Sequence, residues 1–322
     1  MHSIESYTQL IEKEIDSLKI KDEPRNLYDP IKYLLRIGGK RMRPVLSMMS
    51  AELFGESPEK ALNAGLAIEL FHNFSLIHDD IMDNAPLRRG HATVHEKWSD
   101  KTAILSGDAL FVVAYHYLAR NDSKFLTELL HNFSVTVMEV CEGQQMDMDF
   151  ELRNDVTIEE YIEMIRLKTS VLLGSALEMG AIIAGASMAD RKKIYAFGQH
   201  VGIAFQLQDD ILDLYANPDK FGKQIGGDII ANKKTFLQLK AIELSSEIQL
   251  NKLHSLSALE NIESKVTQTR QLFDELGIRD LARAEMERHY AIAKESIHAI
   301  DVPKERILPL LGIAEYLMNR EV

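Results

Sequence analysis

The sequence predicts an all-α protein, a large single-domain bundle of long helices around a central apolar cavity. Apolar residues recur at the helical spacing i, i+3, i+4 and i+7 through residues 161–185, and again through 191–214. Proline, which breaks helix interiors, is absent between Leu87 and Asn217. Alternation of apolar and polar residues with a period of two is scarce, so we predict no strand.

The helices can be placed in order along the chain. Residues 1–18 carry charges throughout, which indicates an amphipathic helix and not a signal peptide. Ser57 and Pro58 suit an N-cap and the first helical position, and predict a helix of about 25 residues from there. Since no break resembles a long flexible linker, we expect one domain over residues 1–322. The breaks are expected at 22–30, 38–44, 84–95 and 217–235, with short turns near 121, 155, 187, 276 and 302.

Composition limits the classes of function. The chain has 322 residues, 46% of them apolar, enough for a sizeable core. Its net charge of −12 argues against a nucleic-acid partner, which needs a basic surface. Cys141 is the single cysteine, so no disulfide can form within the chain. No apolar run approaches the length of a membrane span. We therefore expect a cytoplasmic protein without a transmembrane segment.

An Asp-Asp-x-x-Asp motif occurs twice, each time after an apolar helical run. On a helix, residues three and four apart share a face, so each motif gathers three carboxylates that repel one another. One such motif is compatible with a solvated acidic surface, whereas two copies beside apolar runs favour a site for hard divalent cations such as Mg²⁺. The motifs are Asp79, Asp80 and Asp83, and Asp209, Asp210 and Asp213.

Cationic and glycine-rich segments alternate with these acids. Arginine and lysine beside a metal cluster suit multiply charged phosphates, although each segment alone is typical of an ordinary surface. Together they predict a diphosphate site. The segments are GGKRMRP at 38–44, Arg88-Arg89-Gly90, Lys168-Thr169, the stretch 221–228, and Asn232-Lys233-Lys234-Thr235.

The ordered set of motifs resembles the trans-type isoprenyl diphosphate synthases, the polyprenyl synthetase family. The resemblance extends over almost the whole chain and rests on GGKRMRP, HNFSLIHDDIMDNAPLRRG, GQQMD, KT, FQLQDDILD and GKQIGGDIIANKKT. It implies an isoprenoid synthase fold, a homodimer, and condensation of isopentenyl diphosphate with an allylic diphosphate (dimethylallyl, geranyl or farnesyl). The products would be geranylgeranyl or farnesyl diphosphate and pyrophosphate.

The resemblance also implies residue roles. About three Mg²⁺ ions would be held by Asp79, Asp80, Asp83, Asp209 and Asp210, with Asp213 behind them. The allylic diphosphate would contact Arg88, Lys168, Gln206, Lys223 and Lys233. Isopentenyl diphosphate would contact Lys40, Arg43, His72 and Arg89. Thr169 would lie near the reacting carbons, and Gln144 and Asp147 would support the site.

Product length is expected to depend on the depth of the apolar pocket below the first acidic motif. One helical turn is about 5.4 Å, so Ser75 and Phe74 lie a little over one turn before Asp79, and Phe71 about two turns before it. A Phe at 74 beside a small Ser at 75 resembles enzymes that stop at twenty or fifteen carbons. Phe71 and Phe74 are equally compatible with ordinary core packing.

Three other functions are compatible with parts of the sequence. A class I terpene cyclase also ionises a prenyl diphosphate with Mg²⁺, but its second metal motif normally contains Asn and Ser or Thr. A non-catalytic subunit of a heteromeric prenyl synthase would share the fold, but the six aspartates are intact here. A di-iron carboxylate bundle would use Glu-x-x-His pairs, which occur at Glu69/His72, Glu128/His131 and Glu295/His298.

Overall fold

The structure is a computed structural model that describes residues 2–216 and 225–319. Its regular secondary structure is helical, apart from one pair of two-residue strands among the described residues. The chain divides into two compact units, Met1–Ser134 with Ser175–Ile194, and Val135–Gly174 with Tyr195–Val322. The long helices α7 (Ser123–Leu152), α9 (Val171–Ile183) and α10 (Met188–Tyr215) contribute residues to both. Within the described ranges, no helix is long and apolar enough to cross a membrane.

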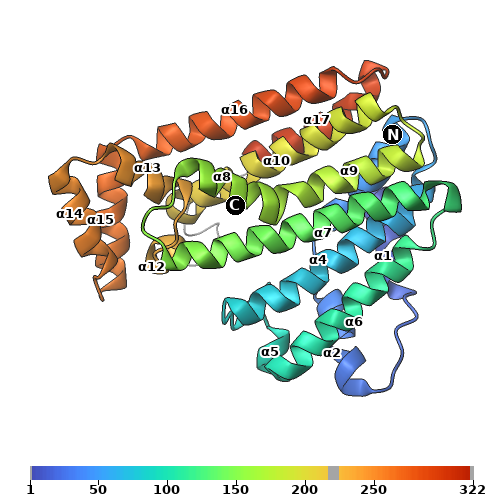
Figure 1. Cartoon of the computed structure of the whole chain (residues 1–322), viewed down its shortest axis with the longest axis horizontal. Coiled ribbons are helices and arrows are strands. Elements are labelled where there is room, and N and C mark those ends of the chain that lie inside the picture. The colour runs from blue at the N-terminus through green and yellow to red at the C-terminus, as the bar shows by residue number, and fades with distance from the viewer. Residues whose placement is uncertain (1, 217–224, 320–322) are drawn as a thin grey trace. The chain divides into compact units, whose positions relative to one another are not determined.

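The first unit is built around α4 (Leu62–Met82). The first half of this helix is buried on all sides, as expected for a core helix. It packs against α3 and α6, and Figure 1 shows α4 and α6 side by side. The other elements are α1 (Ile4–Asp16), α2 (Arg25–Ile37), α3 (Met42–Leu53), η1 (Pro58–Ala61), β1 (Leu87–Arg88), β2 (His91–Ala92), α5 (Val94–Lys97) and α6 (Asp100–Leu118).

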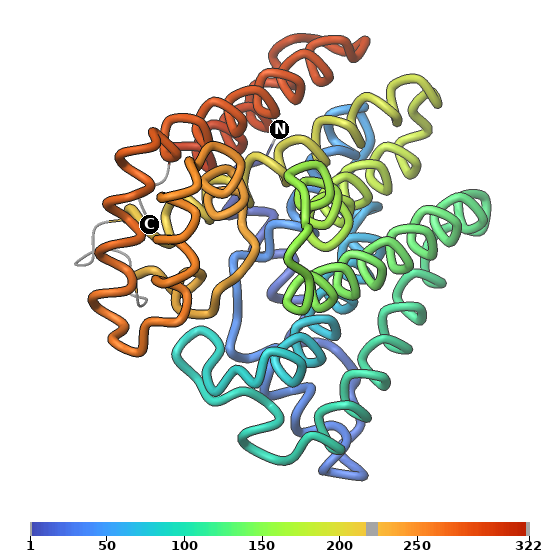
Figure 2. The backbone as a smooth tube through the Cα atoms, turned by 60° about the vertical axis from the view of Figure 1, so that its left-hand side comes forward, coloured from blue at the N-terminus to red at the C-terminus, as the bar shows by residue number. Residues whose placement is uncertain are grey.

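The second unit contains the remaining helices. In α8 (Ile158–Ile165), Thr157 and Glu160 form a capping box that fixes the helix start. A π-helical turn, Arg166–Ser170, follows α8 directly. Figure 2 shows the chain from amber to orange gathering into a group of short helices, among which α15 contacts α12, α14 and α16. These elements are α12 (Gly227–Ile230), α13 (Phe236–Leu244), α14 (Glu247–Ser257), α15 (Ile262–Glu275), α16 (Ile278–His298) and α17 (Lys304–Asn319).

The structure corrects three local predictions. Strands β1 and β2 form a minimal hairpin whose two turn residues, Arg89 and Gly90, have φ of 52° and 77°. Positive φ at both positions is the signature of a tight hairpin turn, but two-residue strands are too short for a period-two pattern. Helix α2 already begins at Arg25 and includes Pro30, because Ile31 and Leu34 bury its apolar face. The helix predicted from Pro58 starts as a 3₁₀ turn and becomes α-helical at Leu62. A single domain over residues 1–322 stays a prediction.

Candidate active site

The first acidic motif lies in the last turn of α4. Carboxylates are unfavourable at a helix C-terminus, where the helix dipole is negative, so this position calls for cations. Asp80 turns inward, with 1% of its surface exposed, and Arg88 donates from Nε to both carboxylate oxygens at 2.8 Å. Asp79 is half-buried, and Asp83 is exposed as the C-cap residue. The three carboxylates are therefore not equivalent: Asp80 is buried and holds Arg88, Asp79 is half-buried, and Asp83 is exposed.

A cluster of cations lies close to this motif in the same unit. Burial and the guanidinium of Arg43 hold the pKa of His72 well below its ordinary value, and Arg89, Arg88 and Arg41 add to the effect. His72 is therefore neutral near pH 7. Burial lowers the pKa of Arg43, an effect that Glu69 opposes and Arg89 reinforces. Among the residues that the structure describes, the buried Nε of Arg43 has no hydrogen-bond partner. Such concentrated positive charge suits a multiply charged anion.

The glycine-rich turn at 38–41 shapes this cluster. A Cβ added at Gly39 would lie 2.7 Å from Nη1 of Arg89, so only glycine lets that guanidinium lie against the turn. Arg41 does not join the anion site, although the sequence grouped it with Lys40 and Arg43. It has φ of 48° and is fully buried, and it donates to Glu12 at 2.9 Å and to Glu69 at 3.0 Å. Lys40 is exposed at the rim of the turn.

Aromatic rings fill the space along α4 before the first acidic motif. Phe71 is fully buried, and Phe74 stacks on Phe111 of α6 with ring centroids 4.9 Å apart. Phe71 also contacts Phe111 at 5.7 Å and Phe133 of α7 at 5.7 Å. The hydroxyl of Ser75 donates to the backbone oxygen of His72. Two of the predicted chain-length residues thus belong to an aromatic cluster contributed by three helices.

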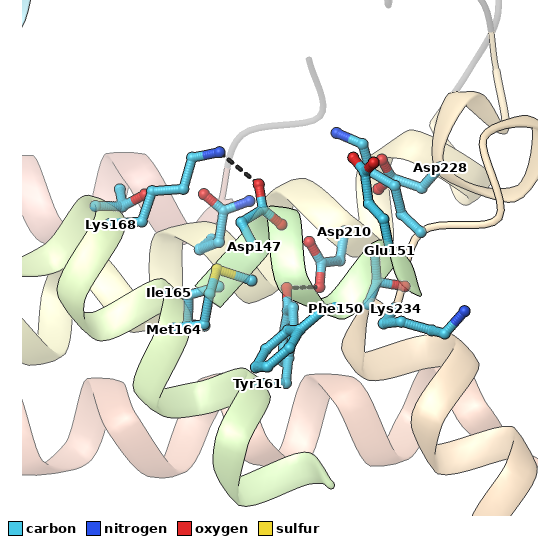
Figure 3. A pocket seen from close by; sticks show the side chains of 14 residues that line it. Asp147, Phe150, Glu151, Tyr161, Met164, Ile165, Lys168, Asp210, Asp228 and Lys234 are labelled. Carbon is cyan, nitrogen blue, oxygen red and sulfur yellow. Dashed lines mark hydrogen bonds and ion pairs between the residues drawn. The ribbon is translucent and has the colours of Figure 1, made fainter. Parts of the chain in front are cut away.

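The second unit contains a pocket along the end of α10 (Figure 3). Two polar pairs face it: Lys168 donates to Asp147 at 2.5 Å, and the Tyr161 hydroxyl donates to Asp210 at 2.5 Å. Lys233 is exposed at its edge. The lining is Asp147, Phe150, Glu151, Tyr161, Met164, Ile165, Lys168, Thr169, Gln206, Asp210, Asp228, Lys233, Lys234 and Thr235.

Two glycines let the π-helical turn with Lys168 and Thr169 approach its neighbours. A Cβ at Gly143 of α7 would lie 2.3 Å from the backbone nitrogen of Lys168. A Cβ at Gly202 of α10 would lie 2.7 Å from Cα of Ser170. The π turn is thus pressed between two helices at positions that only glycine permits. Turns of this kind are frequent at functional sites.

The carboxylates of the second acidic motif are also unequal. Burial, together with the nearby carboxylate of Asp228, raises the pKa of Asp210 to about 8. Asp213 accepts a hydrogen bond from the backbone N–H of Asp228 at 3.1 Å, in the first turn of α12. Asp209 is half-buried. Burial makes ionisation of the Asp210 carboxylate unfavourable, and a cation nearby would favour its charged form. Its oxygen atoms are ligands of the kind that Mg²⁺ prefers.

Lys223 lies outside the described residues. Within the described parts of the chain, no three acidic, histidine or cysteine side chains converge as a ready-made metal site. Mg²⁺ commonly uses one or two carboxylates together with substrate phosphates and water, so its binding does not require such a cage.

Several residues that the structure places here had no role assigned from the sequence. Tyr161 precedes Lys168 by seven residues, about two helical turns, so the spacing could have indicated a shared face. Asp228 lies inside a quoted motif without an assigned role. Phe111 and the buried Arg41 have no local sequence signal, because their positions depend on packing between distant helices.

The geometry can now be compared with known proteins. Residues 24–276 match the sequence profile of the polyprenyl synthetase family. The chain belongs to this family. It is 38% identical over 320 residues to a geranylgeranyl pyrophosphate synthase of Geoglobus acetivorans, covering 99% of this chain and 98% of that protein. It is 36% identical over 321 residues to a geranylgeranyl diphosphate synthase of Methanosarcina mazei, covering 99% and 97%. These relatives confirm a prenyltransferase of the short-chain isoprenyl diphosphate synthase type.

Solved structures confirm the isoprenoid synthase fold. A geranylgeranyl pyrophosphate synthetase of Pyrococcus horikoshii Ot3 matches with a TM-score of 0.92 and 36% identity, covering 98% of this chain and 97% of that chain. A polyprenyl synthase of Caulobacter crescentus CB15, complexed with calcium and isoprenyl diphosphate, matches with a TM-score of 0.87 and 26% identity, covering 99% and 96%. Because Glu69 is committed to Arg41, the Glu69/His72 pair is no di-iron half-site.

Proposed function

We propose that this prenyltransferase condenses isopentenyl diphosphate with an allylic diphosphate to give geranylgeranyl diphosphate. The observation that carries the proposal is the pairing of acidic helix ends with cationic groups. Each motif has one inward aspartate, Asp80 or Asp210, held by hydrogen bonds. Each also keeps a half-buried aspartate, Asp79 or Asp209, close to it in sequence. This arrangement suits a diphosphate bound through divalent cations.

The allylic diphosphate is assigned to the groups around the two acidic motifs. Lys168 lines the pocket of Figure 3 and is oriented by Asp147, so its ammonium is held ready for an anion. Gln206 lines the same pocket as Asp210. Arg88 would contact the diphosphate with donors not used by Asp80. Lys233 and Lys223 complete the assigned set, and Thr169 would lie near the reacting carbons.

Isopentenyl diphosphate is assigned to the cation cluster of the first unit. The buried Nε of Arg43 and the guanidinium of Arg89 would donate to its phosphates. His72 is neutral in the free site and would donate one ring N–H. Lys40 is exposed and would add charge at the entrance. A second diphosphate site favours elongation over the cyclisation that a terpene cyclase performs.

The chemistry requires cleavage of a carbon–oxygen bond to give an allylic cation. Bound Mg²⁺, about three ions as the family resemblance implies, would stabilise the negative charge that develops on the departing pyrophosphate. Lys168, Arg88 and Lys233 would neutralise the same charge. Apolar side chains would keep water from the cation, which the double bond of isopentenyl diphosphate attacks. The departing pyrophosphate would accept the proton then lost.

Product length is assigned to the aromatic cluster. Phe74 and Phe71 lie one and two turns before Asp79, and their rings fill the path that a growing chain would take along α4. A closed floor at this depth supports a short product. Relatives with geranylgeranyl activity in their names support twenty carbons over fifteen.

A homodimer is the proposed assembly. Leu105 and Val112, seven residues apart on one face of α6, are 60% and 67% exposed, and Leu130 of α7 is 44% exposed. Apolar side chains exposed in this way favour a protein partner, and a second copy is the simplest one. Light scattering of the purified chain should give twice the monomer mass, and a monomer would exclude this assembly.

One experiment tests the reaction. Purified protein is incubated with Mg²⁺, labelled isopentenyl diphosphate and each allylic primer, and the products are sized by chromatography. We expect a twenty-carbon diphosphate, no turnover with EDTA, and recovery when Mg²⁺ is restored. Turnover in EDTA would refute the metal mechanism, a cyclic hydrocarbon would indicate a cyclase, and no turnover by the chain alone would indicate a subunit of a larger synthase.

A further inference from the structure

A tyrosine of a neighbouring helix holds the carboxylate of Asp210. The Tyr161 hydroxyl of α8 donates to Oδ2 at 2.5 Å, and Figure 3 shows the ring reaching the carboxylate from the wall of the pocket. Gln206, one turn earlier on α10, lines the same pocket. The bond from Tyr161 therefore links α8 to α10 at the carboxylate of Asp210.

Tyr161 is well suited to hold Asp210 still. Its side chain is 2% exposed, and Asp210 is 4% exposed, so bulk water has little access to the bond between them. A buried tyrosine ring has few alternative rotamers, and its hydroxyl needs a partner. Once a bound cation favours the ionised form of Asp210, the bond from Tyr161 becomes one to a charged group, which is stronger than a bond between neutral groups. The substitution Tyr161→Phe removes this hydroxyl isosterically and leaves the proposed substrate contacts unchanged.

We propose that Tyr161 is a positioning residue, which orients the Asp210 carboxylate for binding of a divalent cation with a diphosphate. The proposal rests on the function proposed above. Tyr161 itself does not contact the substrate. It acts by restricting the rotation of the Asp210 side chain before the cation binds. Binding of the cation then does not have to overcome the entropy cost of ordering that side chain.

The test compares Tyr161→Phe with Tyr215→Phe. Tyr215 is a matched control because it lies on α10 and its hydroxyl also donates to a carboxylate, that of Asp274 at 2.9 Å, away from the pocket. Melting temperature is followed against Mg²⁺ concentration at fixed inorganic pyrophosphate, without turnover. We expect the Mg²⁺ midpoint of Tyr161→Phe to rise about ten-fold, the loss of one hydrogen bond to a charged group. Tyr215→Phe should keep the wild-type midpoint.

Kinetics and a double mutant separate positioning from general damage. The Mg²⁺ concentration for half-maximal activity should rise with the binding midpoint, while kcat at saturating Mg²⁺ falls less. In an Asp210→Asn background, adding Tyr161→Phe should change the midpoint less than about two-fold, because the two residues act as one unit. Equal midpoints for wild type and Tyr161→Phe would overturn the proposal, as would a full ten-fold effect in the Asp210→Asn background.

The same titration separates this inference from the proposed function. A wild-type chain with no Mg²⁺-dependent rise in melting temperature would contradict the proposed function itself. A normal wild-type response with an unaltered Tyr161→Phe response would contradict only the role of Tyr161. If Tyr161→Phe does not fold, Tyr161→His keeps a ring N–H donor. A Mg²⁺ midpoint of Tyr161→His near that of wild type then supports the positioning role of Tyr161. A midpoint raised as far as that of Asp210→Asn overturns it.

Discussion

Replacing Gly143 with alanine should displace the turn that carries Lys168. The added Cβ would lie 2.3 Å from the backbone nitrogen of Lys168, 2.7 Å from its Cα and 2.8 Å from the carbonyl carbon of Leu167. All three are backbone atoms, so no side-chain rotation relieves the overlap. Non-bonded atoms prefer about 3.5 Å or more, so α7 and the π turn must separate by roughly 1 Å.

The expected loss follows from this displacement. Overpacking of this kind costs about 1–3 kcal/mol of stability. A shift of about 1 Å at a catalytic group can lower turnover by about 100-fold. Lys168 is also held by Asp147 at 2.5 Å, and Asp147 lies on the same helix as Gly143. Separation would therefore stretch that bond as well. We expect the fall in kcat, expressed as a free energy, to exceed the fall in the free energy of unfolding.

The assay measures kcat with isopentenyl diphosphate and an allylic primer, together with the melting temperature. Gly312→Ala is the control, because a Cβ there meets no atom within 4 Å and lies in the exposed part of α17. It should leave activity unchanged and raise stability slightly, since alanine favours helix. If Gly143→Ala retained wild-type turnover at an unchanged melting temperature, the close approach would not control the position of Lys168.

Further predictions concern the first unit. Phe74→Ala should lengthen the product by about one isoprene unit, since a stacked ring of the floor is removed; an unchanged product on chromatography would remove Phe74 from the floor. Gly39→Ala should push the Arg89 guanidinium aside and raise KM for isopentenyl diphosphate about ten-fold, while KM for the primer stays constant; equal changes in both would contradict this. The lowered pKa of His72 means that the unfolded chain binds a proton more readily below about pH 6.5. Stability should therefore fall as pH drops from 7 to 5, and His72→Gln should flatten that fall in thermal melts; an identical slope would contradict a neutral His72.

The sequence predicted the helical architecture well because its signals are local. Long apolar periodicity needs no knowledge of tertiary structure. Ser57 does occupy the N-cap position before Pro58, although its side chain makes no capping hydrogen bond. The hairpin of β1 and β2 was not predicted, because a strand of two residues cannot show a periodic pattern. The π turn at Lys168 was not predicted, because it depends on two glycines of other helices, Gly143 and Gly202.

The site was predictable in its residue types but not in their orientations. The motif spacing placed three carboxylates on one side of α4 and of α10. It could not show that Asp80 turns to Arg88, or that Asp210 turns to Tyr161, because those partners are brought in by folding. Likewise, the three cations at 40–43 look alike in sequence. Arg41 differs from its neighbours because folding brings the carboxylates of Glu12 and Glu69 within hydrogen-bond distance of its guanidinium.

The acidic motif of α10 also stabilises the backbone that follows it. Asp213 accepts from the first turn of α12, so the lysine-bearing link at 231–235, which follows α12, is tethered to α10 at its start. Alanine scanning of this motif would consequently release Lys233 at the same time as it deletes an oxygen ligand. Cation affinity and anion affinity would decline together in such variants, and measuring pyrophosphate binding without metal would separate the two losses.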